Sequence, residues 1–264
     1  MKIGFIGTGK ITNSCVRALA GKGHNIFITE RNVSISTELS ESFDDVNVCS
    51  LDFIVSESDV IFLALMENDV DDVLSCLSFR NDQNIISFVL GVDLDRLHNL
   101  CAPARDIAIT IPLPMIEYGN CPLPVFPKSN ALEKIFGSDN LILELNAETE
   151  LIPYFAATAM LSTSLAQLLV AKTWLEGHLN AKEDAEKYLI SLMAGTFSGL
   201  KIDGKDRINE ALASLATKGG LNAQLREHMK KEGTENALHN GLFHLGKRLN
   251  LNLSLIHIYE PTRH

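Results

Sequence analysis

Residues 1–12, MKIGFIGTGKIT, decide the fold. The spacing from Gly4 to Lys10 matches a phosphate-binding P-loop, but that loop requires Ser or Thr after its lysine, and Ile11 stands there. Gly7-Thr8-Gly9 instead follows a short apolar run typical of a buried strand and precedes a helical pattern. This order is typical of the turn that holds a dinucleotide diphosphate on backbone N–H groups. The sequence therefore predicts a dinucleotide-binding domain.

An acidic residue stands where such a domain holds the adenine ribose. Glu30 ends the second apolar run, about 20 residues past the glycines, where a carboxylate accepts hydrogen bonds from ribose hydroxyls. Glu30 favours NAD, because it would repel a 2′-phosphate, whereas Arg31 with Asn32 behind it favours NADP. The two signals conflict. Thr12 occupies the position of the third glycine and is expected to loosen the packing of helix on strand.

Short apolar runs alternate with helical patterns through the first half of the chain. Runs of this kind are typical of strands buried on both faces of a parallel sheet, and the alternation predicts an α/β Rossmann-type doubly wound sheet. The runs are KIGFIG from residue 2, NIFIT from 25, NVCS from 47, DVIFLAL from 59, NIISFV from 84, DIAITI from 106 and LILEL from 141.

The pattern changes after residue 111. Five prolines between 112 and 127 are incompatible with a helix interior or a central strand, so we expect the sheet to end near them, apart from the run at 141. Residues 1–146 are predicted to form the nucleotide domain and 147–252 an all-α domain. Helices are expected at 156–179, 182–200, 205–217, 220–231 and 235–249. The first is nearly uncharged at its start, so we expect it to be buried on most sides, partly against a second subunit. Residues 253–264, LSLIHIYEPTRH, resemble translated adapter sequence and receive no functional role.

Composition limits the partners. A net charge of −10 disfavours binding to nucleic acid and to anionic membranes, and no apolar run is expected to be long enough to span a bilayer. The first run begins near Met1, leaving no room for a signal peptide. The five cysteines lack C-x-x-C spacing, which is typical of reduced thiols in the cytoplasm. Cys15 and Cys76 are expected to be small core residues on helices.

Several stretches together resemble the pyrroline-5-carboxylate reductase family over residues 1–249. They are IGFIGTGKI, SDVIFLAL with DVDDVL, IISFVLGVDLDRL, the IPLP after DIAITI, and TKGGLNAQLREHMKKEG. The resemblance implies a Rossmann domain, a helical dimerisation domain that forms a homodimer or larger assembly, and reduction of a small cyclic imine to proline with NADP or NAD. It shifts the cofactor expectation slightly toward NADP. It also implies an active site in the cleft between the domains, completed by the partner subunit.

Carried over position by position, the resemblance assigns site residues. It implies diphosphate contacts from Gly7, Thr8, Gly9, Lys10 and Ile11, further cofactor contacts from Leu65, Met66 and Gly91, substrate binding by Gly219, Gly220 and Leu221, and catalytic roles for Thr217 and Asn222. Some of these and neighbouring positions differ from the family pattern: Met66-Glu67 replaces Lys-Pro, Leu113-Pro114 replaces Asn-Thr, and Leu221-Asn222 replaces two threonines. Asn222 would meet the imine nitrogen in place of a missing hydroxyl.

Alternatives remain open at this point. The absence of the family's Asn and Thr side chains also suits a nucleotide-binding protein without catalytic activity. Reduction of a keto or hydroxy acid would need a general acid near the nicotinamide, for which no lysine or histidine can be placed. Lys172 with Glu176 fits an i,i+4 ion pair better than a catalytic lysine. The histidines at 228, 239 and 244 lack the spacing of metal ligands, so no metal site is predicted.

Overall fold

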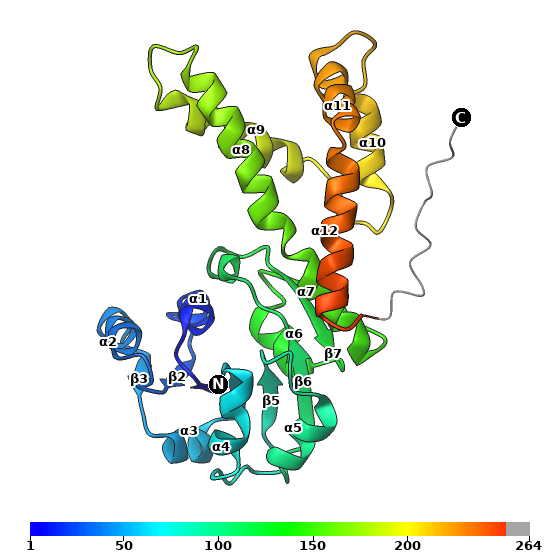
Figure 1. The fold of residues 1–264 in the computed structure, drawn as a ribbon. Helices are drawn as coiled ribbons and strands as arrows, with labels where there is room; N and C mark the ends of the chain where they lie inside the picture. The colour runs from blue at the N-terminus through cyan, green and yellow to red at the C-terminus, as the bar shows by residue number, and fades with distance from the viewer. Residues whose placement is uncertain (252–264) are drawn as a thin grey trace. The chain divides into compact units, whose positions relative to one another are not determined.

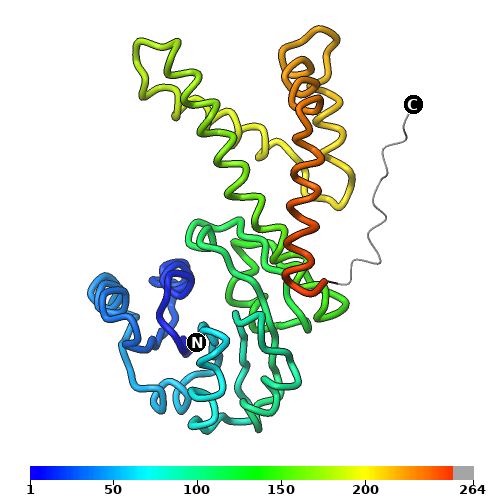
Figure 2. The backbone as a smooth tube through the Cα atoms, in the orientation of Figure 1, coloured from blue at the N-terminus to red at the C-terminus, as the bar shows by residue number. Residues whose placement is uncertain are grey.

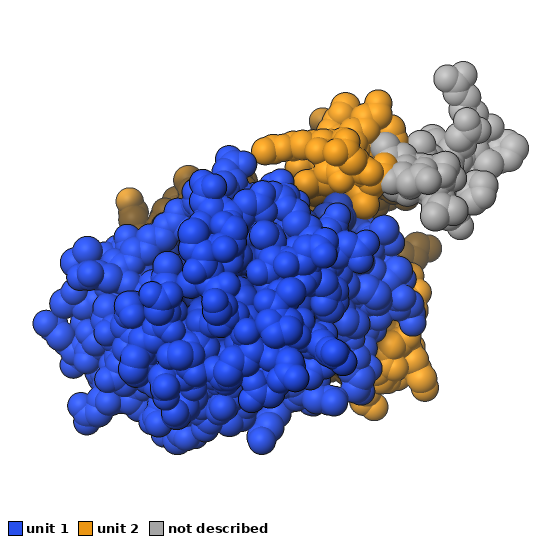
Figure 3. All heavy atoms as spheres, turned by 90° about the horizontal axis from the view of Figure 1, so that it is seen from below, with its two compact units in different colours: residues 1–155 blue, residues 156–264 orange. Residues whose placement is uncertain are grey.

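The computed structural model describes residues 1–251, so the tail from Leu253 lies outside the described residues. The chain divides into two compact units, Met1–Phe155 and a second unit that begins at Ala156 (Figure 3). The sequence placed this boundary after residue 146. The difference comes from Leu151, which is buried in the apolar core of the first unit.

The first unit contains one eight-stranded sheet in the order β3-β2-β1-β4-β5-β6-β7-β8 (Figure 1). All neighbours pair in parallel except β6 and β7. The arrangement confirms the doubly wound sheet, and the strand order reverses between β1 and β4, where such folds bind ligands. The strands are β1 (Lys2–Ile6), β2 (Asn25–Ile28), β3 (Val46–Val48), β4 (Val60–Leu63), β5 (Asn84–Ser87), β6 (Asp106–Thr110), β7 (Pro122–Phe126) and β8 (Leu141–Glu144).

Helices cover both faces of this sheet because successive strand residues point to opposite sides. In β1, Ile3 and Phe5 pack under one layer of helices, whereas Ile6 packs under the other. The first layer comprises α1 (Lys10–Leu19), α2 (Val33–Ser42), the 3₁₀ turn η2 (Pro114–Tyr118) and α6 (Asn130–Phe136). The second comprises α3 (Leu51–Glu57), η1 (Glu67–Asp69) with α4 (Val70–Leu74), α5 (Leu94–Leu100), and η3 (Glu148–Glu150) with α7 (Leu151–Ala157).

The prolines do not end the sheet as predicted, because β7 contains two of them. The carbonyls of Cys121 and Val125 accept hydrogen bonds from the β8 side, at Leu141 and Leu145. Alternate residues of a strand point their backbone groups the other way. Pro122 and Pro124 therefore place their missing N–H groups toward β6, where β7 pairs through only two residue pairs. The strand thus tolerates both prolines.

The described part of the second unit, residues 156–251, contains helices and no strand, as predicted (Figure 2). Helix α9 packs on α8, and α12 packs on α11. The helices that lie wholly in this unit are α8 (Met160–Glu176), α9 (Asp184–Ser198), α10 (Arg207–Ser214), α11 (Leu221–Lys231) and α12 (Thr234–Arg248).

The described residues of the chain do not bury helix α8, so the expectation that it packs inside its own subunit is wrong, whereas burial against a second subunit stays a prediction. None of its residues is buried, and Leu165 and Leu169 are more than half exposed. The stretch Glu148–Glu176 is also long and apolar enough to cross a membrane by length and composition alone, which corrects the expectation that no such run exists. Serine, threonine and glutamine residues interrupt the apolar residues of this stretch, but its mean hydropathy is still 1.4.

Candidate functional site

The turn after β1 requires glycine at its first position. Gly7 has a φ of +103°, and a Cβ there would lie 2.2 Å from the carbonyl oxygen of Ala64. Its N–H donates to Thr29 Oγ1 at 3.1 Å, and the buried hydroxyl of Thr8 donates to the carbonyl oxygen of Thr29. These contacts fix the glycine turn to the end of β2, and so fix its position relative to Glu30 and Arg31, which follow β2.

The second glycine leaves space open at the start of α1. Gly9 is the residue before the helix, its φ is −105°, and a Cβ added to it would meet no atom within 4 Å. The first N–H groups of a helix have no partner within the helix, and the first turn of α1 contains no acidic residue. The backbone N–H groups of Gly9, Lys10 and Ile11 can therefore donate hydrogen bonds to a diphosphate, as the sequence predicts.

Thr12 does not loosen the turn, because its hydroxyl is used within it. The side chain is completely buried, and its Oγ1 donates to the carbonyl oxygen of Gly7 at 2.7 Å. The threonine thus replaces the third glycine and adds a hydrogen bond that holds the first.

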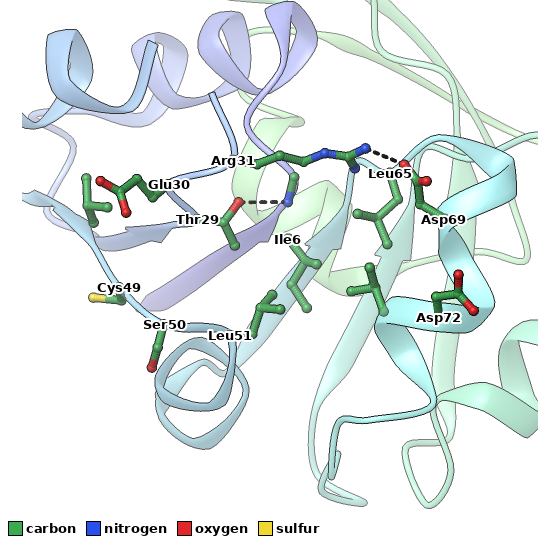
Figure 4. A pocket seen from close by; sticks show the side chains of 13 residues that line it. Ile6, Thr29, Glu30, Arg31, Cys49, Ser50, Leu51, Leu65, Asp69 and Asp72 are labelled. Atoms are coloured by element: carbon green, nitrogen blue, oxygen red, sulfur yellow. Dashed lines mark hydrogen bonds and ion pairs between the residues drawn. The ribbon is translucent and has the colours of Figure 1, made fainter. Parts of the chain in front are cut away.

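A cavity of about 720 Å³ lies beside this turn, at the carboxyl ends of the strands around the point where their order reverses (Figure 4). Four of the predicted cofactor residues line it, namely Gly7, Glu30, Arg31 and Leu65. Its other lining residues come from β1, the end of β2, the β3–α3 segment and the start of α4; they are Ile6, Thr29, Val48, Cys49, Ser50, Leu51, Asp69, Asp72 and Val73. The cavity has the place and the lining expected for an adenosine moiety.

Arg31 forms an ion pair with Asp69, a residue of η1. Figure 4 shows the guanidinium reaching from the segment after β2 to the segment after β4. Strands β2 and β4 flank β1 on its two sides, so the pair spans the strand that carries the glycine turn. Asn32 has a different role, since its side chain accepts a hydrogen bond from Ile35 N and caps α2.

Gly91, a predicted cofactor residue, lies against a carboxylate that the sequence analysis did not expect there. A Cβ on Gly91 would lie 2.0 Å from the carboxylate of Glu67, so these residues are in contact at the ends of β4 and β5. Met66 is 69% exposed and does not line the cavity. The structure therefore leaves Met66 without a visible contact to a cofactor pocket.

The predicted substrate and catalytic residues all lie in the second unit, at the α10–α11 turn. Gly219 has a φ of +76°, and the N–H of Gly220 donates to the carbonyl oxygen of Thr217 at 2.9 Å. The Gly220 N–H is therefore already hydrogen-bonded, and the first N–H groups of α11 without a partner inside the helix are those of Leu221 and Asn222. The Leu221 side chain is 84% exposed.

Sequence reasoning missed three lining residues of consequence. Thr29 holds the turn, Asp69 pairs with Arg31, and Cys49 lines the cavity with a thiol whose pKa is raised by burial. Elsewhere, Lys172 pairs with Glu176 at 2.8 Å as expected. Residues 1–251 contain no group of three or more His, Cys, Asp or Glu side chains arranged to hold a metal ion.

Comparison with known proteins supports the same architecture. Residues 2–91 match the family described as NADP oxidoreductase coenzyme F420-dependent. A search of curated proteins finds no match.

The similar solved structures match nearly the whole chain. A pyrroline-5-carboxylate reductase from Streptococcus pyogenes is 18% identical, with a TM-score of 0.77 and coverage of 94% of this chain and 98% of its own. The Plasmodium falciparum pyrroline carboxylate reductase with NADP bound is 15% identical, with a TM-score of 0.76 and coverage of 94% and 97%. A reductive aminase from Aspergillus terreus in complex with NADPH is 15% identical, with a TM-score of 0.57 and coverage of 95% and 87%. The chain has the fold of the pyrroline-5-carboxylate reductases, which confirms the resemblance at the level of fold.

Proposed function

We propose that this chain is an NAD(P)H-dependent reductase whose substrate is a small cyclic imine, 1-pyrroline-5-carboxylate, and whose product is proline. The observation that carries the proposal is the glycine turn after β1, in which Gly7 is sterically required and Gly9 faces open space where a dinucleotide diphosphate could lie. The likeness in fold to imine reductases over both units supports the reaction class.

The first unit supplies the groups that hold the nucleotide. The amides at the start of α1 bind the diphosphate, and Glu30 accepts hydrogen bonds from the adenine-ribose hydroxyls. Leu65, which is 9% exposed, forms an apolar wall at the end of β4. NAD(P)H, when bound, would supply the hydride that forms the new C–H bond at the imine carbon and would leave as NAD(P)⁺, while the proton carried by the iminium nitrogen becomes the N–H of the amine. Because an iminium is already electron-poor, positioning contributes most of the rate.

The second unit supplies the groups assigned to the substrate. The amides of Leu221 and Asn222 at the start of α11 would hold the carboxylate, since the first turn of this helix contains no acidic residue. The Asn222 side-chain amide would meet the imine nitrogen in place of the family threonine. Thr217 contributes its carbonyl to the Gly220 N–H, so its role is to shape the turn, with its hydroxyl available to the substrate.

We further propose that the protein is a homodimer or larger homo-oligomer in the cytoplasm. Within the described residues, apolar side chains of α8 such as Leu165 and Leu169 are left exposed, and Trp174 is 68% exposed. Exposed apolar surface of this extent is typical of protein interfaces. A second copy would bury the same face on both subunits. The five thiols are all free, which suits a reducing compartment.

The test is an assay of purified protein with pyrroline-5-carboxylate and either reduced nicotinamide nucleotide. We expect loss of nicotinamide absorbance together with formation of proline. Asn222→Ala should raise KM for the imine and leave the affinity for the nucleotide unchanged. Lack of turnover with both nucleotides would refute the proposal.

A second function is supported by Leu221, whose exposed apolar side chain stands at a family threonine position. A chain that lost its substrate groups would bind nucleotide without reducing any imine. A screen of cyclic imines separates the two functions, because turnover of any one of them excludes the non-catalytic protein. The same screen extended to small keto acids tests the remaining oxidoreductase alternative.

A further inference from the structure

The Arg31–Asp69 ion pair occupies the place where a cofactor phosphate would be recognised. Arg31 follows Glu30 directly, and both residues line the cavity beside the glycine turn. An arginine at this position is the group that accommodates the 2′-phosphate of NADP. Here its guanidinium is engaged by a carboxylate from the opposite side of β1.

The charges that line the cavity oppose a further phosphate. Three acidic residues line it, Glu30, Asp69 and Asp72, and Arg31 is its one basic lining residue within the described chain. A 2′-phosphate adds about −1.5 to −2 charges at neutral pH, in line with other phosphomonoesters. It would have to displace Asp69 from Arg31 and still remain close to Glu30. A ribose with a free 2′-hydroxyl avoids both conflicts and can donate to Glu30.

We propose that Asp69 sets the cofactor preference of this protein, and that it favours NADH over NADPH by withholding Arg31 from the 2′-phosphate. The inference rests on the proposed function, because it concerns the nucleotide site of that reductase. Asp69 acts through Arg31, so it is a positioning residue. The pair is partly exposed, with 48% and 39% of its two side chains accessible, and Arg31 can therefore turn to a phosphate once Asp69 no longer holds it.

The full-length protein provides the test, with NADH and NADPH titrated separately and nicotinamide fluorescence as the signal. The ratio of the two dissociation constants isolates the effect of the 2′-phosphate, whereas a general structural defect would weaken both complexes. We expect wild type to bind NADH more tightly. Asp69→Asn should shift the ratio toward NADPH by about 1.5- to 5-fold, the range expected when an exposed ion pair is removed.

Two control variants make the result specific. Asp71→Asn removes a neighbouring acid that pairs with Arg96 and does not line the cavity, so its ratio should equal that of wild type. Arg31→Met combined with Asp69→Asn should abolish the shift. An unchanged ratio in Asp69→Asn, or a wild type that prefers NADPH, would overturn this inference alone. Failure of wild type to bind either nucleotide would overturn the proposed function and this inference with it.

Discussion

Replacing the two glycines of the turn by alanine should affect different properties: Gly9→Ala should weaken nucleotide binding, whereas Gly7→Ala should lower stability. In Gly9→Ala the backbone needs no change, because the φ of −105° suits any residue and the new Cβ meets no atom within 4 Å. The protein should therefore keep the stability of wild type. The methyl would, however, occupy the space through which a diphosphate approaches the amides of α1.

The loss of affinity can be estimated from the hydrogen bonds at risk. A hydrogen bond to a charged group contributes about 1.5–3 kcal/mol. Displacing the diphosphate from one such amide should therefore weaken NADH binding by about 10- to 100-fold. Isothermal titration calorimetry measures this change, and thermal unfolding verifies that Gly9→Ala remains folded.

Gly7→Ala is the matched contrast, because it should damage the fold itself. A positive φ costs an L-residue about 1–2 kcal/mol, and forcing a Cβ against the Ala64 carbonyl adds about 1–3 kcal/mol. A total of about 2–5 kcal/mol corresponds to a lowering of Tm by roughly 5–20 °C. A folded Gly9→Ala that binds NADH as tightly as wild type would refute the reasoning about the turn.

Three further predictions concern other parts of the chain. Thr12→Val should lower the free energy of unfolding by about 1–2 kcal/mol, since it removes the hydrogen bond to the turn, and Thr12→Ser should restore most of it in urea titrations. Because burial raises the pKa of the Cys49 thiol, alkylation of Cys49 should require alkaline pH. Bound NADH should slow the alkylation of Cys49, which lines the cavity, and should not protect the exposed Cys76. Mass spectrometry measures both rates, and equal rates for Cys49 with and without NADH would contradict the prediction. Leu165→Glu should convert the oligomer to a monomer in light scattering, and an unchanged mass would exclude α8 from the interface.

Much of the fold was predictable because its strands are buried on both faces. The runs at 2, 25, 59, 84 and 106 are continuous apolar segments, and each is a strand in the structure. Strand β7 escaped prediction, because the tolerance of Pro122 and Pro124 depends on which neighbour each backbone group faces. The prediction that Cys76 is a core residue on a helix was wrong, because α4 ends at Leu74 and Cys76 is exposed beyond it.

The candidate site was predictable where chemistry follows from local spacing. Gly7 and Glu30 belong to a recognisable pattern, and both line the cavity. The roles of Thr29 and Asp69 depend on contacts that join residues 22 and 38 positions apart, which no local pattern encodes. The exposed state of α8 also could not be derived, because apolar composition indicates that a surface is covered without indicating by what.

The most direct test of the central claim is a crystal structure of the protein with NADH. The account predicts the diphosphate within hydrogen-bond distance of the amides at Gly9 to Ile11, and the adenine ribose beside Glu30. A nucleotide bound elsewhere, or a turn that remains empty at saturating NADH, would contradict it.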